Sequence, residues 1–215
     1  MAEEKQHPEG LTEAQEQLAL ELFGIGAIKF GAFRLKLHEK RPDAPLSPIY
    51  VDLRILRSCP FTMKAVVKVF ERMSEGFEFD CYADVPTAAT PIVAVLSCET
   101  WVPMITPREP KTHGAIGSID GVFEPGQTVL LIDDLVIRAD SKLEAIKTLE
   151  GNKLIVRDVL VLVDREQGGP EQLREAGYTL HAAFKLSQLL RYYVRVGKID
   201  QNKYDEVMTY LETNR

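Results

Sequence analysis

Short apolar runs alternate with longer segments of periodic apolar positions through the middle of the chain, and this pattern predicts an α/β fold. Runs typical of buried strands occupy residues 79–85, 102–105, 129–132, 158–163 and 180–184. Apolar residues at helical spacing predict helices over residues 59–74, 88–98 and 141–149, and one that ends within residues 172–177. Buried strands that alternate with helices favour a mainly parallel sheet with helices on both faces.

Helices are also expected near the two ends of the chain. The first spans residues 12–23, because Thr12 can cap its start and Gln15 stands three residues later, as in a capping box. Two more helices are predicted over residues 187–195 and 201–213.

The segment after the first helix has a different pattern. Residues 28–37 alternate in polarity, which predicts a pair of half-exposed strands that turns at Gly31. Residues 38–48 are charged and contain proline, so we expect a loop there, and residues 49–53 predict another short strand.

The apolar run over residues 129–132 ends on two adjacent carboxylates, Asp133 and Asp134. A buried parallel strand that stops on acidic residues delivers them to the carboxyl edge of the sheet, where α/β proteins bind ligands. The other loops that leave predicted strands at that edge with polar side chains are residues 84–89, 106–121 and 164–169. Adjacent acids also occur in purely structural turns, and the pair alone favours that alternative.

Composition narrows the class of protein. The chain has 26 basic and 32 acidic residues, a net charge of −6 and no basic stripe, so a nucleic-acid partner is not expected. No run approaches the ~18 apolar residues of a membrane span, and the three cysteines are widely spaced, as in reduced cytoplasmic proteins. We interpret residues 1–215 as one cytoplasmic domain without a membrane partner, with residues 1–10 as a disordered tail.

Several segments resemble orotate phosphoribosyltransferase, in the form fused into bifunctional UMP synthases. They contain the strings KFGxFxLK, SPIYxDLR and DREQGG in order, and they occupy residues 28–36, 47–54, 108–114, 131–134 and 162–169. The similarity runs from about Leu18 to the C-terminus, with one insertion near residues 38–46. It implies a type I phosphoribosyltransferase fold, a mainly parallel sheet flanked by helices with an N-terminal hood.

The resemblance also implies an activity and a site. Enzymes of this family transfer phosphoribose from phosphoribosyl pyrophosphate (PRPP) to orotate with Mg²⁺, in pyrimidine biosynthesis, and act as homodimers with a mobile catalytic loop. The catalytic residues that it implies are Lys111, His113 and Asp134. The substrate-binding residues are Lys36, Arg108, Asp133, Asp134, Arg138, Ser141 and Arg165. Mg²⁺ is expected to be held mainly by PRPP and water near the acidic pair, without a direct protein ligand.

The chain departs from the family pattern where phosphate is recognised. After the acidic pair, Ile137, Arg138, Ala139 and Asp140 replace a Thr/Ser/Gly-rich loop whose backbone N–H groups surround a phosphate. Asp84 replaces a glycine, Pro107 replaces a basic residue, and Leu37 and His38 precede the insertion in place of Ser-Gly. Together these departures favour impaired or altered PRPP binding, unless Arg138 replaces the lost donors.

Three hypotheses therefore stay open. The chain is an active orotate phosphoribosyltransferase, or an inactive homologue that serves as a nucleotide-binding or regulatory protein. The third is a phosphoribosyltransferase with a changed substrate.

Overall fold

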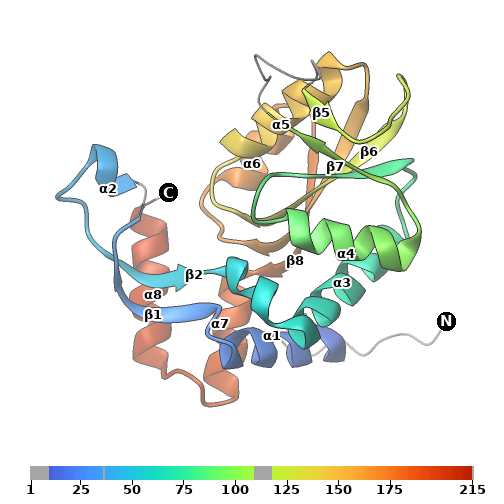
Figure 1. Ribbon diagram of the computed structural model, residues 1–215. Coiled ribbons are helices and arrows are strands. Elements are labelled where there is room, and N and C mark those ends of the chain that lie inside the picture. The colour runs from blue at the N-terminus through green and yellow to red at the C-terminus, as the bar shows by residue number, and fades with distance from the viewer. Residues whose placement is uncertain (1–9, 36, 109–117, 215) are drawn as a thin grey trace. The chain divides into compact units, whose positions relative to one another are not determined.

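The computed structural model describes residues 10–35, 37–108 and 118–214, which form two compact units (Figure 1). The larger unit is Met63–Lys185, and the smaller unit joins Met1–Thr62 to Leu186–Arg215. Each unit has its own sheet, and each is described by itself.

The larger unit is built on a six-stranded sheet in the order β5-β4-β3-β6-β7-β8. Its strands are β3 (Cys81–Asp84), β4 (Met104–Pro107), β5 (Ile119–Asp120), β6 (Thr128–Val136), β7 (Ile155–Asp164) and β8 (Thr179–Lys185). All neighbouring pairs are parallel except β4 and β5. The prediction of a mainly parallel sheet is confirmed, and β6 lies at its centre.

Helices cover both faces of this sheet, as Figure 1 shows for α4 and α5. They are α3 (Pro60–Ser74), of which all but the first turn belongs to this unit, α4 (Thr90–Thr100), α5 (Asp140–Gly151) and α6 (Gly169–Glu175). The hydrophobic core on the α5 face includes Leu131, Val161, Ile146, Leu149 and Leu173. Side chains alternate between the faces of a strand, so Asp133 projects toward the same face as Leu131.

The smaller unit combines a hairpin with helices from both ends of the chain. Its elements are α1 (Glu13–Gly24), β1 (Ile28–Phe33), α2 (Leu37–Lys40), β2 (Ser47–Val51), η1 (Leu53–Ser58), α7 (Leu186–Arg195) and α8 (Gln201–Thr213). The capping box is confirmed, since Thr12 and Gln15 bond reciprocally at the start of α1. The Tyr193 hydroxyl donates to the Ala19 carbonyl at 2.8 Å and so connects α7 to α1.

Three sequence-based expectations about elements are wrong. Residues 28–33 form one strand, with no turn at Gly31, and the partner of this strand is β2. The segment expected to be a loop after residue 37 begins with the short helix α2. The strand expected to stop before Asp133 continues to Val136, because β7 runs beside it and Val136 pairs with Asp164. The acidic pair therefore lies inside β6.

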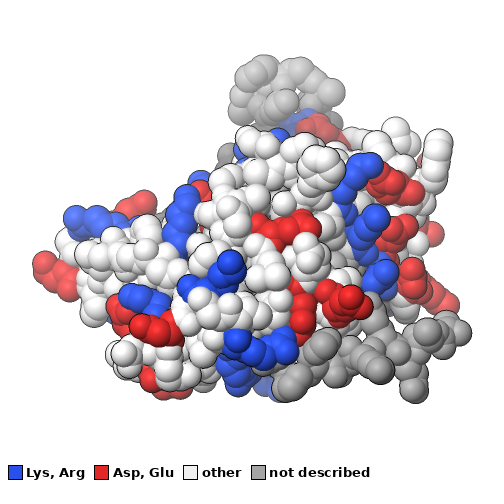
Figure 2. Space-filling model, turned by 90° about the horizontal axis from the view of Figure 1, so that it is seen from below, with Lys and Arg blue, Asp and Glu red and all other residues white. Residues whose placement is uncertain are grey.

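On the face in Figure 2, basic and acidic side chains are interspersed. Among the described residues, none of the helices has the length and hydrophobicity that a membrane crossing requires.

A close backbone approach at Gly169 gives a first prediction. A Cβ atom there would lie 2.3 Å from Val136 Cγ2 and 3.1 Å from the Ile137 carbonyl oxygen. Valine is stiff, so Gly169→Ala must move the backbone, and we expect it to lower the free energy of unfolding by about 1–3 kcal/mol. Thermal denaturation measures this loss. Gly151→Ala is the control, because a Cβ there meets no atom within 4 Å; equal melting temperatures for the two variants would contradict the close approach.

Candidate functional site

Loops that follow β3, β6 and β7 meet at the carboxyl edge of the larger unit's sheet. The Val85 N–H donates to the Ile132 carbonyl and the Arg165 N–H to the Val136 carbonyl, both at 3.0 Å. These bonds connect the loop after β3 and the loop after β7 to the end of β6. The described parts of these loops therefore lie beside the end of β6, the strand that carries the two carboxylates.

The acidic pair is buried and bonded within the chain. Asp133 is 5% exposed and Asp134 8% exposed. Asp133 Oδ1 accepts the Asp134 N–H at 2.8 Å, and Asp134 Oδ1 accepts the Leu135 N–H at 2.8 Å. Lys142, in the first turn of α5, places its Nζ 2.5 Å from Asp133 Oδ2 and donates to the Leu135 carbonyl at 2.6 Å.

Burial changes the acidity of Asp134. It raises the pKa of Asp134 to about 7, and the neighbouring Asp133 charge adds to the effect. Burial also raises the pKa of Asp164, at the end of β7. Carboxyls with raised pKa values in a sheet-edge site are candidates for ligand binding, because a ligand that donates hydrogen bonds favours the ionised form.

Sequence reasoning missed Lys142. Its signal was present, since Lys142 stands in the apolar stripe formed by Ala145, Ile146 and Leu149 on the buried face of α5. A lysine in such a stripe requires a buried anion, because an isolated buried ammonium is costly. The nearest acids along the chain were Asp140 and Glu144, and only the fold brings Asp133 to it.

Asp84, the last residue of β3, is not exposed to a ligand. Its carboxylate is fully buried and accepts hydrogen bonds from the hydroxyls of Thr90, at the start of α4, and Thr106, in β4. Two hydroxyl donors compensate for the burial of this carboxylate. The charge of Asp84 is thus taken up by hydrogen bonds inside the protein.

The segment after β6 is folded against the loop after β7. The Ala139 N–H donates to Gln172 Oε1 at 2.8 Å, and Arg138 Nη1 lies 3.6 Å from the position of a Cβ on Gly168. Asp140 is exposed and starts α5, where the helix dipole favours a negative charge. Asp140 therefore does not point inward toward the acidic pair, and Arg138 is an exposed cation beside Gly168.

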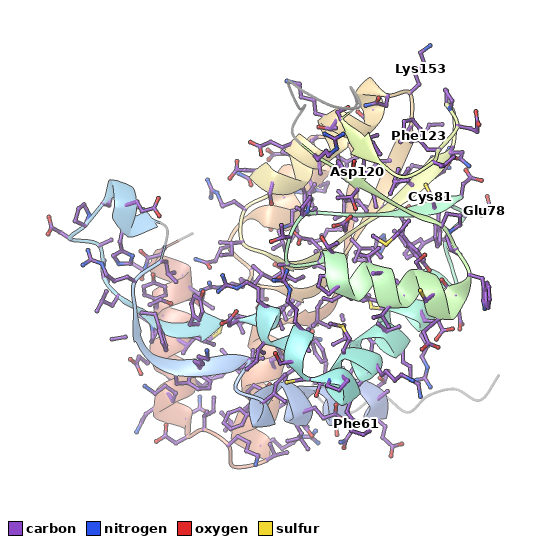
Figure 3. All side chains as sticks on the ribbon, in the orientation of Figure 1. Phe61, Glu78, Cys81, Asp120, Phe123 and Lys153 are labelled. Carbon is purple, nitrogen blue, oxygen red and sulfur yellow. The ribbon has the colours of Figure 1, made fainter. Side chains whose placement is uncertain are left out.

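A cavity of about 410 Å³ opens between the loop after β3, the end of β4 and one face of α5. It is lined by Val85, Pro86, Pro107, Arg108, Ser141, Glu144, Ala145 and Thr148. Arg108 is held at its rim by an ion pair with Asp120, whose Oδ1 lies 2.6 Å from Nε; Figure 3 labels Asp120. Two predicted substrate-binding residues, Arg108 and Ser141, thus share one cavity.

The other predicted site residues divide into two groups. Lys36, Lys111 and His113 lie outside the described residues, so their roles stay predictions. Arg165 is 2% exposed, in the loop after β7, and its contact with orotate also stays a prediction.

A divalent cation held by the protein alone does not fit these residues. Both oxygens of Asp133 are engaged, by Lys142 and by the Asp134 N–H. Within the described ranges, no group of three or more His, Cys, Asp or Glu side chains could hold a metal ion. A cation at this edge would therefore depend on the oxygens of a phosphate ligand.

Comparison with known proteins assigns the family, although no protein-family model matches the chain. An orotate phosphoribosyltransferase of Chlamydia caviae is 31% identical over 202 residues, which cover 93% of this chain and 95% of that protein. The uridine 5′-monophosphate synthase of Bos taurus is 34% identical, and the match covers 90% of this chain and 40% of that protein. The structure of Leishmania donovani UMP synthase superimposes with a TM-score of 0.82 at 34% identity, over 93% of this chain and 42% of the other. The chain belongs to the orotate phosphoribosyltransferase family, with the type I phosphoribosyltransferase fold.

Proposed function

We propose that this chain catalyses the transfer of phosphoribose from PRPP to orotate, which forms orotidine 5′-monophosphate and pyrophosphate. The observation that carries the proposal is the buried acidic pair of β6, a strand bonded to the loop that lines one cavity with Arg108 and Ser141. Mg²⁺ enters as the PRPP complex. A homodimer and a cytoplasmic location belong to the same proposal and are supported by the family resemblance.

The residues fit the charge changes of this reaction. As pyrophosphate leaves C1′ of the ribose, positive charge grows on the sugar and negative charge on the departing oxygens. Ionised Asp134 accepts hydrogen bonds from the ribose hydroxyls and favours the cationic sugar, while Arg108 is proposed to stabilise the leaving group. Lys111 and His113 are proposed to add cations and exclude water, and Arg165 and Lys36 to bind the orotate carboxylate.

The alternative of an inactive binding protein is not favoured. It depended on four departures from the family pattern. Asp84 is bonded inside the sheet and Asp140 is exposed at a helix start, so neither carboxylate opposes a phosphate in the way the sequence suggested. The loss of a hydroxyl and a glycine from the loop is the departure that remains. Arg138 is proposed to bind the 5′-phosphate in place of these groups.

Turnover tests the proposal directly. Loss of orotate absorbance is expected when the protein meets orotate, PRPP and Mg²⁺. Asp134→Asn should lower kcat/KM by about 10²-fold, because a preorganised charge at the reacting sugar is lost. Asp140→Asn, which removes an exposed carboxylate at the start of α5, is the control and should retain activity. Folded wild-type protein that shows no turnover at high PRPP would refute the activity.

PRPP binding tests the role of Arg138. Saturating PRPP with Mg²⁺ should raise the melting temperature, since a ligand of the folded state at 100 times its Kd adds about 2.7 kcal/mol. Arg138→Ala should weaken PRPP binding about tenfold, the loss expected for a charge-assisted hydrogen bond. Lys147→Ala, at an exposed position of α5, should bind like wild type. An unchanged Kd in Arg138→Ala would show that the 5′-phosphate is bound without this arginine.

The acidic pair also predicts how stability depends on pH. The pKa of Asp134 is about 7 in the folded protein and 3.8 for an ordinary aspartate in an unfolded chain. Between these two pH values the folded state binds a proton that the unfolded state has lost. Stability from this group is therefore lost as pH rises from about 4 to 7. The melting temperature of Asp134→Asn should exceed that of wild type at pH 8, and the gap should close toward pH 4. A gap independent of pH would contradict the raised pKa.

A further inference from the structure

Lys142 is a buried cation to which the family resemblance assigns no role. It is 4% exposed, and its ammonium contacts Asp133 Oδ2 at 2.5 Å and the Leu135 carbonyl at 2.6 Å. Burial of an ammonium is tolerated only with a close anion and further hydrogen bonds, and this site supplies both. The contacts join the end of β6 to the first turn of α5, on either side of the altered phosphate loop.

The ion pair engages Asp133 inside the protein. Its second oxygen accepts the Asp134 N–H at 2.8 Å, so both oxygens of this carboxylate have partners in the chain. A ribose hydroxyl that bonded Asp133 would have to compete with a buried ammonium 2.5 Å away. Asp134 is held differently: its Oδ1 accepts the Leu135 N–H at 2.8 Å and its side chain is hydrogen-bonded to that of Asp133, but no described residue forms an ion pair with it as Lys142 does with Asp133.

The ion pair between Lys142 and Asp133 also lowers the negative charge that a phosphorylated ligand meets. Two uncompensated carboxylates beside a loop that has lost a hydroxyl donor would repel a polyanion. Lys142 cancels one of these charges from within the fold, in a chain whose loop lacks the glycine and the first hydroxyl of its family. Charge compensation at the acidic pair thus accompanies the altered loop.

We propose that Lys142 is a positioning residue, which holds Asp133 in an internal ion pair and leaves Asp134 as the carboxylate that receives the vicinal hydroxyls of the phosphoribosyl ligand. The inference rests on the proposed function and deepens it. The resemblance implies that Asp133 and Asp134 both bind substrate, whereas this inference assigns the ribose hydroxyls to Asp134 alone.

The test compares Lys142→Met with the double variant Asp133→Asn/Lys142→Met. Lys142→Met leaves a buried carboxylate without its counter-ion, so we expect a lower melting temperature and a KM for PRPP raised about tenfold, with kcat at saturating PRPP within about twofold of wild type. The double variant removes the unpaired charge and should recover most of both losses. Lys147→Met, at an exposed position of the same helix, should change neither.

The outcomes separate this inference from the proposed function. A selective rise in KM that the double variant reverses supports the inference, because a lysine with only a structural role would not produce it. A double variant that binds PRPP as weakly as Asp134→Asn overturns it, since Asp133 would then contact the ligand. If wild type neither turns over nor binds PRPP, the proposed function and the role of Asp134 both fail. In that case the melting temperatures still test the ion pair between Lys142 and Asp133. If the losses of stability from the two substitutions were additive in the double variant, the ion pair would be refuted.

Discussion

Two adjacent carboxylates lie inside the central strand of the larger unit, and the cost of burying them constrains the residues around them. Desolvation alone opposes two negative charges at neighbouring positions of one strand. The protein responds with a lysine from α5 at 2.5 Å from Asp133, and with backbone N–H donors from Asp134 and Leu135. These bonds allow β6 to continue beside β7 as far as Val136.

The extension of β6 determines where the following loop can go. Val136 and Ile137 pass so close to Gly169 that a methyl group there would overlap them, and the Ala139 N–H reaches Gln172 of α6. The segment after β6 is therefore shaped by its contacts with the loop after β7. Gly169 is required because the segment after β6 passes so close to it. The two segments therefore pack together at the ligand edge.

The chain belongs to the orotate phosphoribosyltransferase family although its phosphate loop departs from the family pattern. The structure shows how the two are compatible. The two acidic departures are accommodated without opposing a phosphate: Asp84 is bonded to threonine hydroxyls, and Asp140 is exposed at the start of a helix. The charge of Asp133 is balanced by Lys142. Asp134 keeps a raised pKa because the remaining burial is not compensated. A buried carboxyl of that kind destabilises the free protein and gains from a ligand that donates hydrogen bonds to it.

The sequence by itself determined the order and type of most elements, because periodicity and capping are local. Local patterns were enough to predict the parallel strands, the capping box of Thr12 and Gln15, and helix α8 over Gln201–Thr213. The motif strings likewise identified the family and placed Arg108, Ser141 and the acidic pair at one edge. The end of β6, the direction of Asp84 and the partner of Lys142 were decided only by the tertiary structure. Each depends on an element that packing brings close: β7 for the strand, Thr106 of β4 for Asp84, and the end of β6 for a lysine that its own helix leaves among apolar residues.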